Sequence, residues 1–216
     1  VYDLCPVWMA DYLKREFPLR KAFFVGVSLG GKMAIEIAGR FPEIFAGAVL
    51  TDVGPGKLMD SELFHFVANV LPKLNLERPW SELRQELRAK IPDRMLRILV
   101  QSHLEYPDKA IPKARWKTQA VGFPQLVQGS SLEDQWHWVG KIKSPIWVLK
   151  SGVLSAINHQ DFKKIEQNHN FHIIDLPEAG HFIQITHIKK FTQVVIDCFK
   201  PSSQETQVDH AANDLN

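Results

Sequence analysis

Short, continuous apolar runs alternate with amphipathic stretches toward both ends of this chain. Continuous apolar runs are typical of strands that are buried on both faces of a parallel sheet. Amphipathic stretches bounded by proline or glycine are typical of the helices that cover such a sheet. The pattern therefore predicts an α/β chain, with strands over 21–27, 45–51, 145–150 and 171–176 and helices over 7–17, 32–40, 159–167 and 185–199.

The middle of the chain has a different pattern, because helical periodicity dominates it and no strand pattern is convincing. Helices are predicted over 61–74, 81–90 and 93–104, with Ser81 and Asp93 as N-caps. The tail beyond Pro201 is polar and predicted to be disordered. The chain then divides into a strand–helix–strand core, an all-helical insert, the last core strands and the tail, at 1–56, 57–139, 140–200 and 201–216.

Composition narrows the class of protein. The chain is 45% hydrophobic and 23% charged, which is typical of a globular domain, and its net charge of +2 argues for neither nucleic acid nor an anionic membrane as partner. Cys5 and Cys198 form no disulfide framework and suit a reducing compartment. No apolar run approaches membrane-spanning length, and no signal peptide or metal-ligand spacing is found. We predict a cytoplasmic domain without metal or cofactor.

The segment from Phe23 to Ala34 carries the strongest chemical signal. It reads as a strand, then Gly26-Val27-Ser28-Leu29-Gly30, then a helix, which is the pattern of a nucleophile elbow. Such a turn holds a serine in a strained, exposed conformation, and a side chain two residues before or after the serine is expected to collide with the backbone. The bare pattern is common, so an ordinary Gly/Ser-rich turn is the alternative.

Three blocks resemble the α/β-hydrolase superfamily, and within it the esterase-like enzymes with a helical cap. They are the elbow, the stretch 40–55 and the segment Glu178-Ala179-Gly180-His181-Phe182. The blocks follow the superfamily's order and span the chain from near Val1 to about Lys200. The resemblance implies a mostly parallel sheet, the insert as a cap over the active site, and hydrolysis of a small-molecule carboxylic ester or related acyl compound.

The same resemblance assigns roles to individual residues. Ser28 would be the nucleophile, His181 its base and the backbone N–H of Leu29 one oxyanion donor. The second donor normally comes from a loop upstream of the opening helix. Because the chain begins within that helix, we expect it to be a fragment of a longer protein or a truncated gene product.

The third member of the triad departs from the pattern. The superfamily usually places an aspartate three residues beyond a glycine after the cap, and that position, counted from Gly152, is Ser155. A serine cannot stabilise the imidazolium through an ionic hydrogen bond. Asp52, at a strand end that some members use for the acid, is the best substitute, ahead of Asp161 and Asp175. Asp161 is expected to point to solvent.

Two interpretations of function remain. One is a serine hydrolase; the other is a degenerate hydrolase-like domain that binds a ligand or partner with little turnover, which the serine at 155 supports. In the superfamily, the elbow strand is paired on both sides, whereas this chain contains one expected neighbour. An exposed sheet edge and self-association through it are therefore predicted.

Overall fold

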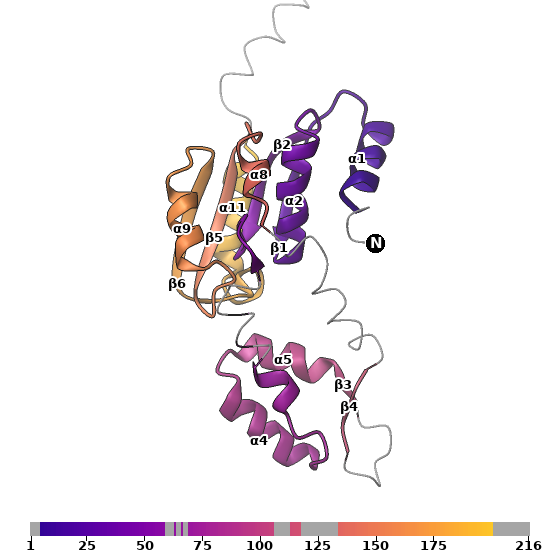
Figure 1. Cartoon of the computed structure of the whole chain (residues 1–216), viewed down its shortest axis with the longest axis vertical. Coiled ribbons are helices and arrows are strands. Elements are labelled where there is room, and N and C mark those ends of the chain that lie inside the picture. The colour runs from indigo at the N-terminus through magenta and orange to yellow at the C-terminus, as the bar shows by residue number, and fades with distance from the viewer. Residues whose placement is uncertain are drawn as a thin grey trace, which may run out of the picture.

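The computed structural model describes residues 5–58, 63, 66, 69–105, 113–117 and 134–200. Four parallel strands form its main sheet in the order β1-β2-β5-β6 (Figure 1). They are β1 (Ala22–Val27), β2 (Phe45–Thr51), β5 (Ile146–Val153) and β6 (Phe171–Gly180). All four predicted strands are confirmed, and the last two continue beyond their predicted ends.

Alternate residues of the central strands build two hydrophobic cores, one on each face of the sheet. Ala48 and Leu50 of β2 belong to the core beneath α2, whereas Val49 between them belongs to the core beneath α11. The first face carries α1 (Cys5–Glu16), α2 (Leu29–Arg40), α8 (Trp136–Val139) and α9 (His159–Glu166). The second carries α10 (Ile183–Thr186) and α11 (Ile188–Cys198), which replace the single helix predicted over 185–199. Among the described residues, none of the helices combines the length and hydrophobicity that crossing a bilayer requires.

The insert is not all-helical, so that part of the fold prediction is wrong. Its described elements are η3 (Leu71–Lys73), α4 (Trp80–Lys90), α5 (Arg94–Ser102), β3 (Leu104–Glu105) and β4 (Arg115–Trp116). β3 and β4 pair antiparallel over two residues each, too short a stretch for strand periodicity to be visible in the sequence. Six of the fourteen residues of the helix predicted over 61–74, and the whole tail 201–216, lie outside the described residues.

The two predicted N-caps of the insert have different outcomes. Asp93 caps α5, because its carboxylate accepts a 2.6 Å hydrogen bond from the N–H of Leu96. Ser81 is not a cap: α4 begins one residue before it, and Pro79 occupies the N-cap position. Pro79 has φ −54° and ψ 149°, and a non-helical ψ of this kind is typical of an N-cap residue, so the helix starts at Trp80.

The insert rests on the loops that follow β5 and β6. Leu83, Leu87 and Ile91 are fully buried in its own core, and Leu154 and Phe182 of the main domain pack against that core. Figure 1 shows α4 and α5 on this side of the sheet. By contrast, α8, which the sequence pattern places at the end of the insert, packs against α2 and contributes Val139 to the main core.

Strand β1 forms one edge of the described sheet. At the two ends of this strand, the N–H groups of Ala22 and Ser28 donate to carbonyls on the β2 side, those of Ile44 (2.7 Å) and Thr51 (3.3 Å). Because backbone groups of a strand alternate in direction, the N–H groups of Phe23 and Val25 point away from β2. These two side chains are also 45% and 46% exposed. Strand edges of this kind act as templates for pairing with another chain.

We expect the 216-residue chain to self-associate by pairing the β1 edges of two copies. Size-exclusion chromatography with light scattering should give a mass above that of a monomer. Val25→Lys, which places a charge on the edge, should shift the protein to monomer. Ile98→Lys is the matched control, since Ile98 is similarly exposed but lies on α5 of the insert. A monomeric wild-type chain would contradict the prediction.

Candidate functional site

Three successive strands of the sheet are each followed by a residue with a positive φ. Ser28, Asp52 and Leu154 directly follow β1, β2 and β5 and have φ of 50°, 47° and 51°. This left-handed region costs a residue with a side chain about 1–2 kcal/mol. Such strain persists only where the surrounding structure holds it, and it is common at functional sites. The carboxyl ends of these strands therefore form the candidate functional site.

The turn at Ser28 has the geometry expected of a nucleophile elbow. A Cβ added at Gly26 would lie 2.6 Å from the Cα of Gly31, so the strand and the helix approach too closely for a side chain there. The expectation for Gly30 is wrong, because a Cβ there would meet nothing within 4 Å. The Ser28 side chain makes no capping hydrogen bond to α2, although Ser28 occupies the N-cap position. Its hydroxyl thus lies at the N-terminus of a twelve-residue helix, which favours negative charge.

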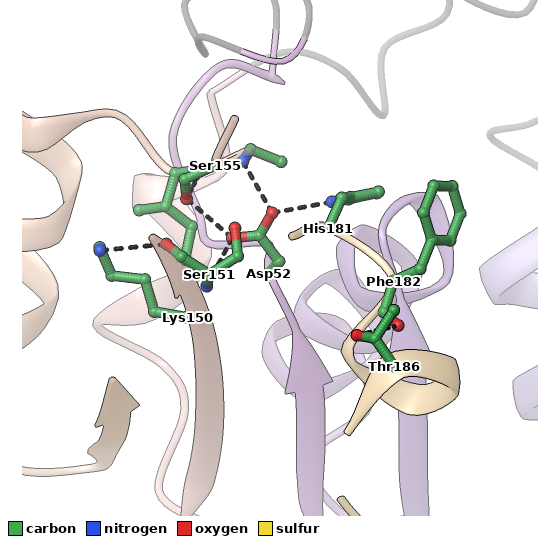
Figure 2. A network of polar contacts seen from close by, with 9 residues as sticks. Asp52, Lys150, Ser151, Ser155, His181, Phe182 and Thr186 are labelled. Carbon is green, nitrogen blue, oxygen red and sulfur yellow. Dashed lines mark hydrogen bonds and ion pairs between the residues drawn. The ribbon is translucent and has the colours of Figure 1, made fainter. Parts of the chain in front are cut away.

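Asp52 and His181 form a buried pair at the ends of β2 and β6. The Oδ2 atom of Asp52 lies 2.8 Å from Nδ1 of His181, and the two residues are 0% and 6% exposed. Figure 2 shows the Asp52 carboxylate between His181 and the loop that carries Ser155. A carboxylate that accepts the Nδ1–H of a histidine fixes the tautomer in which Nε2 can act as a base.

The carboxylate of Asp52 accepts three further hydrogen bonds. Oδ2 accepts from the N–H of Ala156 (2.9 Å), and Oδ1 accepts from the hydroxyl of Ser155 (2.7 Å) and the N–H of Ser151 (3.1 Å). Burial by itself raises the pKa of Asp52, but the hydrogen bond and charge of His181 and the donors at 156 and 155 outweigh it and lower the pKa. Asp52 is therefore ionised at neutral pH.

Ser155 has a role that the sequence did not reveal. It occupies the position where an acid was expected, and its hydroxyl donates to Asp52 while accepting from the N–H of Ile157 at 3.1 Å. The hydroxyl links the loop after β5 to the carboxylate at the end of β2. The serine at position 155 indicated that another residue supplies the acid. The sequence could not show that Ser155 itself hydrogen-bonds to that acid, Asp52.

The two other candidate acids have different partners. The carboxylate of Asp161 accepts from Trp136 Nε1 (2.9 Å) and from the side-chain amide of Asn158 (2.5 Å). Asp161 is buried, so the expectation that it points to solvent is wrong. Asp175 pairs with Lys150 at 3.3 Å on the neighbouring strand. Within the described residues, neither carboxylate hydrogen-bonds to His181.

The position of Ser28 relative to this pair follows from the sheet. Val27 lies opposite Thr51, so Ser28 and Asp52 stand at the ends of neighbouring strands, which run about 4.8 Å apart. His181 is bound to Asp52. No hydrogen bond joins the Ser28 hydroxyl to His181 in the described part of the chain. The backbone of Leu29 lies at the first position of α2. No group of three metal-ligating side chains occurs among the described residues.

No protein-family model and no curated protein matches the sequence. Solved structures do match. A marine microorganism esterase is similar with a TM-score of 0.64 and 18% identity, over 91% of this chain and 76% of its own. E-2-(acetamidomethylene)succinate hydrolase is similar with a TM-score of 0.63 and 16% identity, over 91% of this chain and 72% of its own. An α/β fold family hydrolase from Bacillus anthracis str. Sterne is similar with a TM-score of 0.59 and 15% identity, over 92% of this chain and 76% of its own. The chain thus has the α/β-hydrolase fold, as its sequence motifs predict.

Proposed function

We propose that this chain is a serine hydrolase that cleaves a carboxylic ester or a related acyl compound through an acyl-enzyme on Ser28. The observation that carries the proposal is the buried Asp52–His181 pair, at 2.8 Å, beside a serine held at φ 50° at the end of the neighbouring strand. The fold supports it too, because the solved structures with this fold named above are described as an esterase and hydrolases.

The reaction would proceed in two stages. In the first, the Ser28 hydroxyl attacks the acyl carbon while Nε2 of His181 takes its proton, and Asp52 stabilises the resulting imidazolium. The N–H of Leu29 and the N-terminus of α2 favour the negative charge on the carbonyl oxygen. His181 then gives its proton to the leaving alkoxide. In the second stage, His181 takes a proton from a water molecule that attacks the acyl-enzyme, and it gives this proton to Oγ of Ser28 as the acyl–oxygen bond breaks and the acid is released.

A fluorophosphonate probe tests the nucleophile, because it forms a covalent bond with activated serines. We expect one equivalent to label the protein at Ser28, and we expect Ser28→Ala to abolish the labelling. Ser144→Ala is the matched control: its hydroxyl bonds only to the carbonyl of Phe45 in the described structure, at 3.1 Å, far along the chain from the elbow. Labelling that persists in Ser28→Ala would exclude Ser28 as the nucleophile.

A second candidate is a degenerate hydrolase-like domain that binds a ligand or a partner with little turnover. The absence of a hydrogen bond between the Ser28 hydroxyl and His181, both within the described residues, favours it. Steady-state hydrolysis of a series of p-nitrophenyl esters separates the two candidates. Labelling with turnover supports the hydrolase, whereas labelling without turnover for every ester supports the binding domain.

A further inference from the structure

Lys32 is a buried charge that the proposed mechanism does not use. It lies one helical turn after Ser28 on α2, and its side chain is 0% exposed. Lysine is rarely buried to this extent unless its ammonium group is well bonded. Here Nζ donates to the carbonyl oxygens of Pro55, at 3.1 Å, and Gly56, at 2.5 Å.

These two carbonyls belong to the turn that follows Asp52. Asp52 has φ 47°, and the chain then turns through Val53 and Gly54 before it reaches the carbonyls bound by Lys32. Lys32 therefore connects α2, the helix that follows Ser28, to the turn that follows Asp52. Hydrogen bonds from an ammonium group are about twice as strong as those between neutral groups.

Two more elements hold the same turn from other sides. The N–H of Gln135, just before α8, donates to the carbonyl of Pro55 at 2.8 Å, and the Gln135 side-chain amide donates to the carbonyl of Lys32 at 3.1 Å. The carboxylate of Asp161, on α9, lies against Gly56 so closely that no Cβ fits there. The turn is thus clamped by three elements far apart in the sequence.

A strained residue needs such support. The left-handed conformation of Asp52 is unfavourable for a residue with a side chain, so a loosened turn would let Asp52 relax and carry its carboxylate away from Nδ1 of His181. We propose that Lys32 is a positioning residue, which holds the turn over residues 53–56 and thereby keeps the Asp52 carboxylate in line with His181. Its consequence for turnover rests on the proposed function, but its consequence for the Asp52–His181 pair does not.

Lys32→Met tests this, because methionine has nearly the same length and fills the buried site without donating. The first readout is the Nδ1–H proton of His181 in NMR spectra of protein labelled with ¹⁵N-histidine, assigned by its loss in His181→Gln. We expect the resonance to move in Lys32→Met toward its position in Asp52→Asn, or to broaden beyond detection. Glu36→Gln is the matched control, as Glu36 lies one turn further along α2, is buried and pairs with Arg40 at 2.6 Å. It should leave the resonance in place.

The second readout is the kinetics of ester hydrolysis. Misplacement of a catalytic group by about 1 Å can cost on the order of 10²-fold, so we expect kcat to fall by about that factor in Lys32→Met with KM unchanged. A merely structural lysine would lower the melting temperature but leave both kcat and the resonance of the folded protein unchanged. That result overturns the proposal.

Two further outcomes are distinguishable. If Lys32→Met does not fold, Lys32→Gln, whose donor is one bond shorter and still polar, is measured in its place with the same two expected results. If the wild-type protein hydrolyses no ester, the proposed function fails, but the His181 resonance still decides whether Lys32 holds the pair together.

Discussion

Replacing Asp52 with asparagine should lower the turnover number for an ester on the order of 10⁴-fold, the loss that this change causes in a serine protease. The carboxylate accepts from Nδ1 of His181 at 2.8 Å and also from the N–H of Ala156. The other oxygen, Oδ1, accepts from the hydroxyl of Ser155 and the N–H of Ser151. An asparagine has one oxygen for these two pairs of donors and no negative charge, and when its oxygen faces Ser155 and Ser151 its NH₂ group faces His181. The imidazole then loses the partner that fixes its tautomer, and Nε2 no longer serves as a base.

The measurement is kcat for a p-nitrophenyl ester at neutral pH. Asp175→Asn is the matched control, since Asp175 was a rival for the acid but is exposed and pairs with Lys150 at 3.3 Å. That variant should retain wild-type turnover. A normal kcat in Asp52→Asn, or a large loss in Asp175→Asn, would show that the acid has been assigned to the wrong residue.

The pH dependence of stability provides a second check on Asp52. Although burial raises its pKa, the partners of the carboxylate lower the pKa below its ordinary value in the folded state. In the unfolded chain, aspartate titrates near a pKa of about 3.9. The contribution of Asp52 to the free energy of unfolding is therefore complete above about pH 4 and is lost as the pH falls through the folded pKa. Denaturant unfolding of wild type and Asp52→Asn should show a difference that shrinks below about pH 4.

Local patterns in the sequence were enough to predict the sheet and two members of the proposed triad. The elbow and the Gly-His pair are each encoded within about six consecutive residues, so a single stretch carries the signal. The acid was harder, because the bond between Asp52 and His181 joins residues 129 positions apart. Only the absence of an acid at 155 and the place of Asp52 at a strand end pointed to it.

Contacts between distant segments account for what the sequence did not show. The burial of Asp161 depends on Trp136, a residue from a different element, and that of Lys32 depends on the turn at Pro55. Periodicity reports which face of an element is apolar but not which polar side chains that face will cover. The expectation for Gly30 was wrong for the same reason, because the space around a turn is set by the neighbouring helix and strand rather than by the turn's own residues.

Ser155→Asp, which restores an acid at the superfamily's usual position, should damage the protein. From the sequence alone the change appears harmless, since an aspartate is expected there. In the structure, the Ser155 hydroxyl lies 2.7 Å from Oδ1 of Asp52, and both residues are buried. A second carboxylate at that site cannot ionise beside the first without strong repulsion, and the donor that Oδ1 requires is lost.

The expected cost to the free energy of unfolding is about 3–5 kcal/mol at neutral pH, the range for an uncompensated charge left in a protein interior. Repulsion raises the pKa of the two-carboxylate pair, so at about pH 5 the folded state still binds a proton that the unfolded state has released, and it loses that proton as the pH rises. The damage should therefore grow as the pH rises from about 5 to 8. Chemical denaturation across that range measures it.

Ser155→Asn is the matched control, because it has the shape of aspartate, keeps an N–H donor for Asp52 and adds no charge. It should retain far more stability than Ser155→Asp and show no loss with rising pH. The opposite outcome is informative as well. If Ser155→Asp is stable and active, and remains active when combined with Asp52→Asn, the loop after β5 can present an acid to His181 by itself. The contact between Ser155 and Asp52 would then be dispensable. The triad acid could then lie either after β2, as Asp52 does, or in the loop after β5.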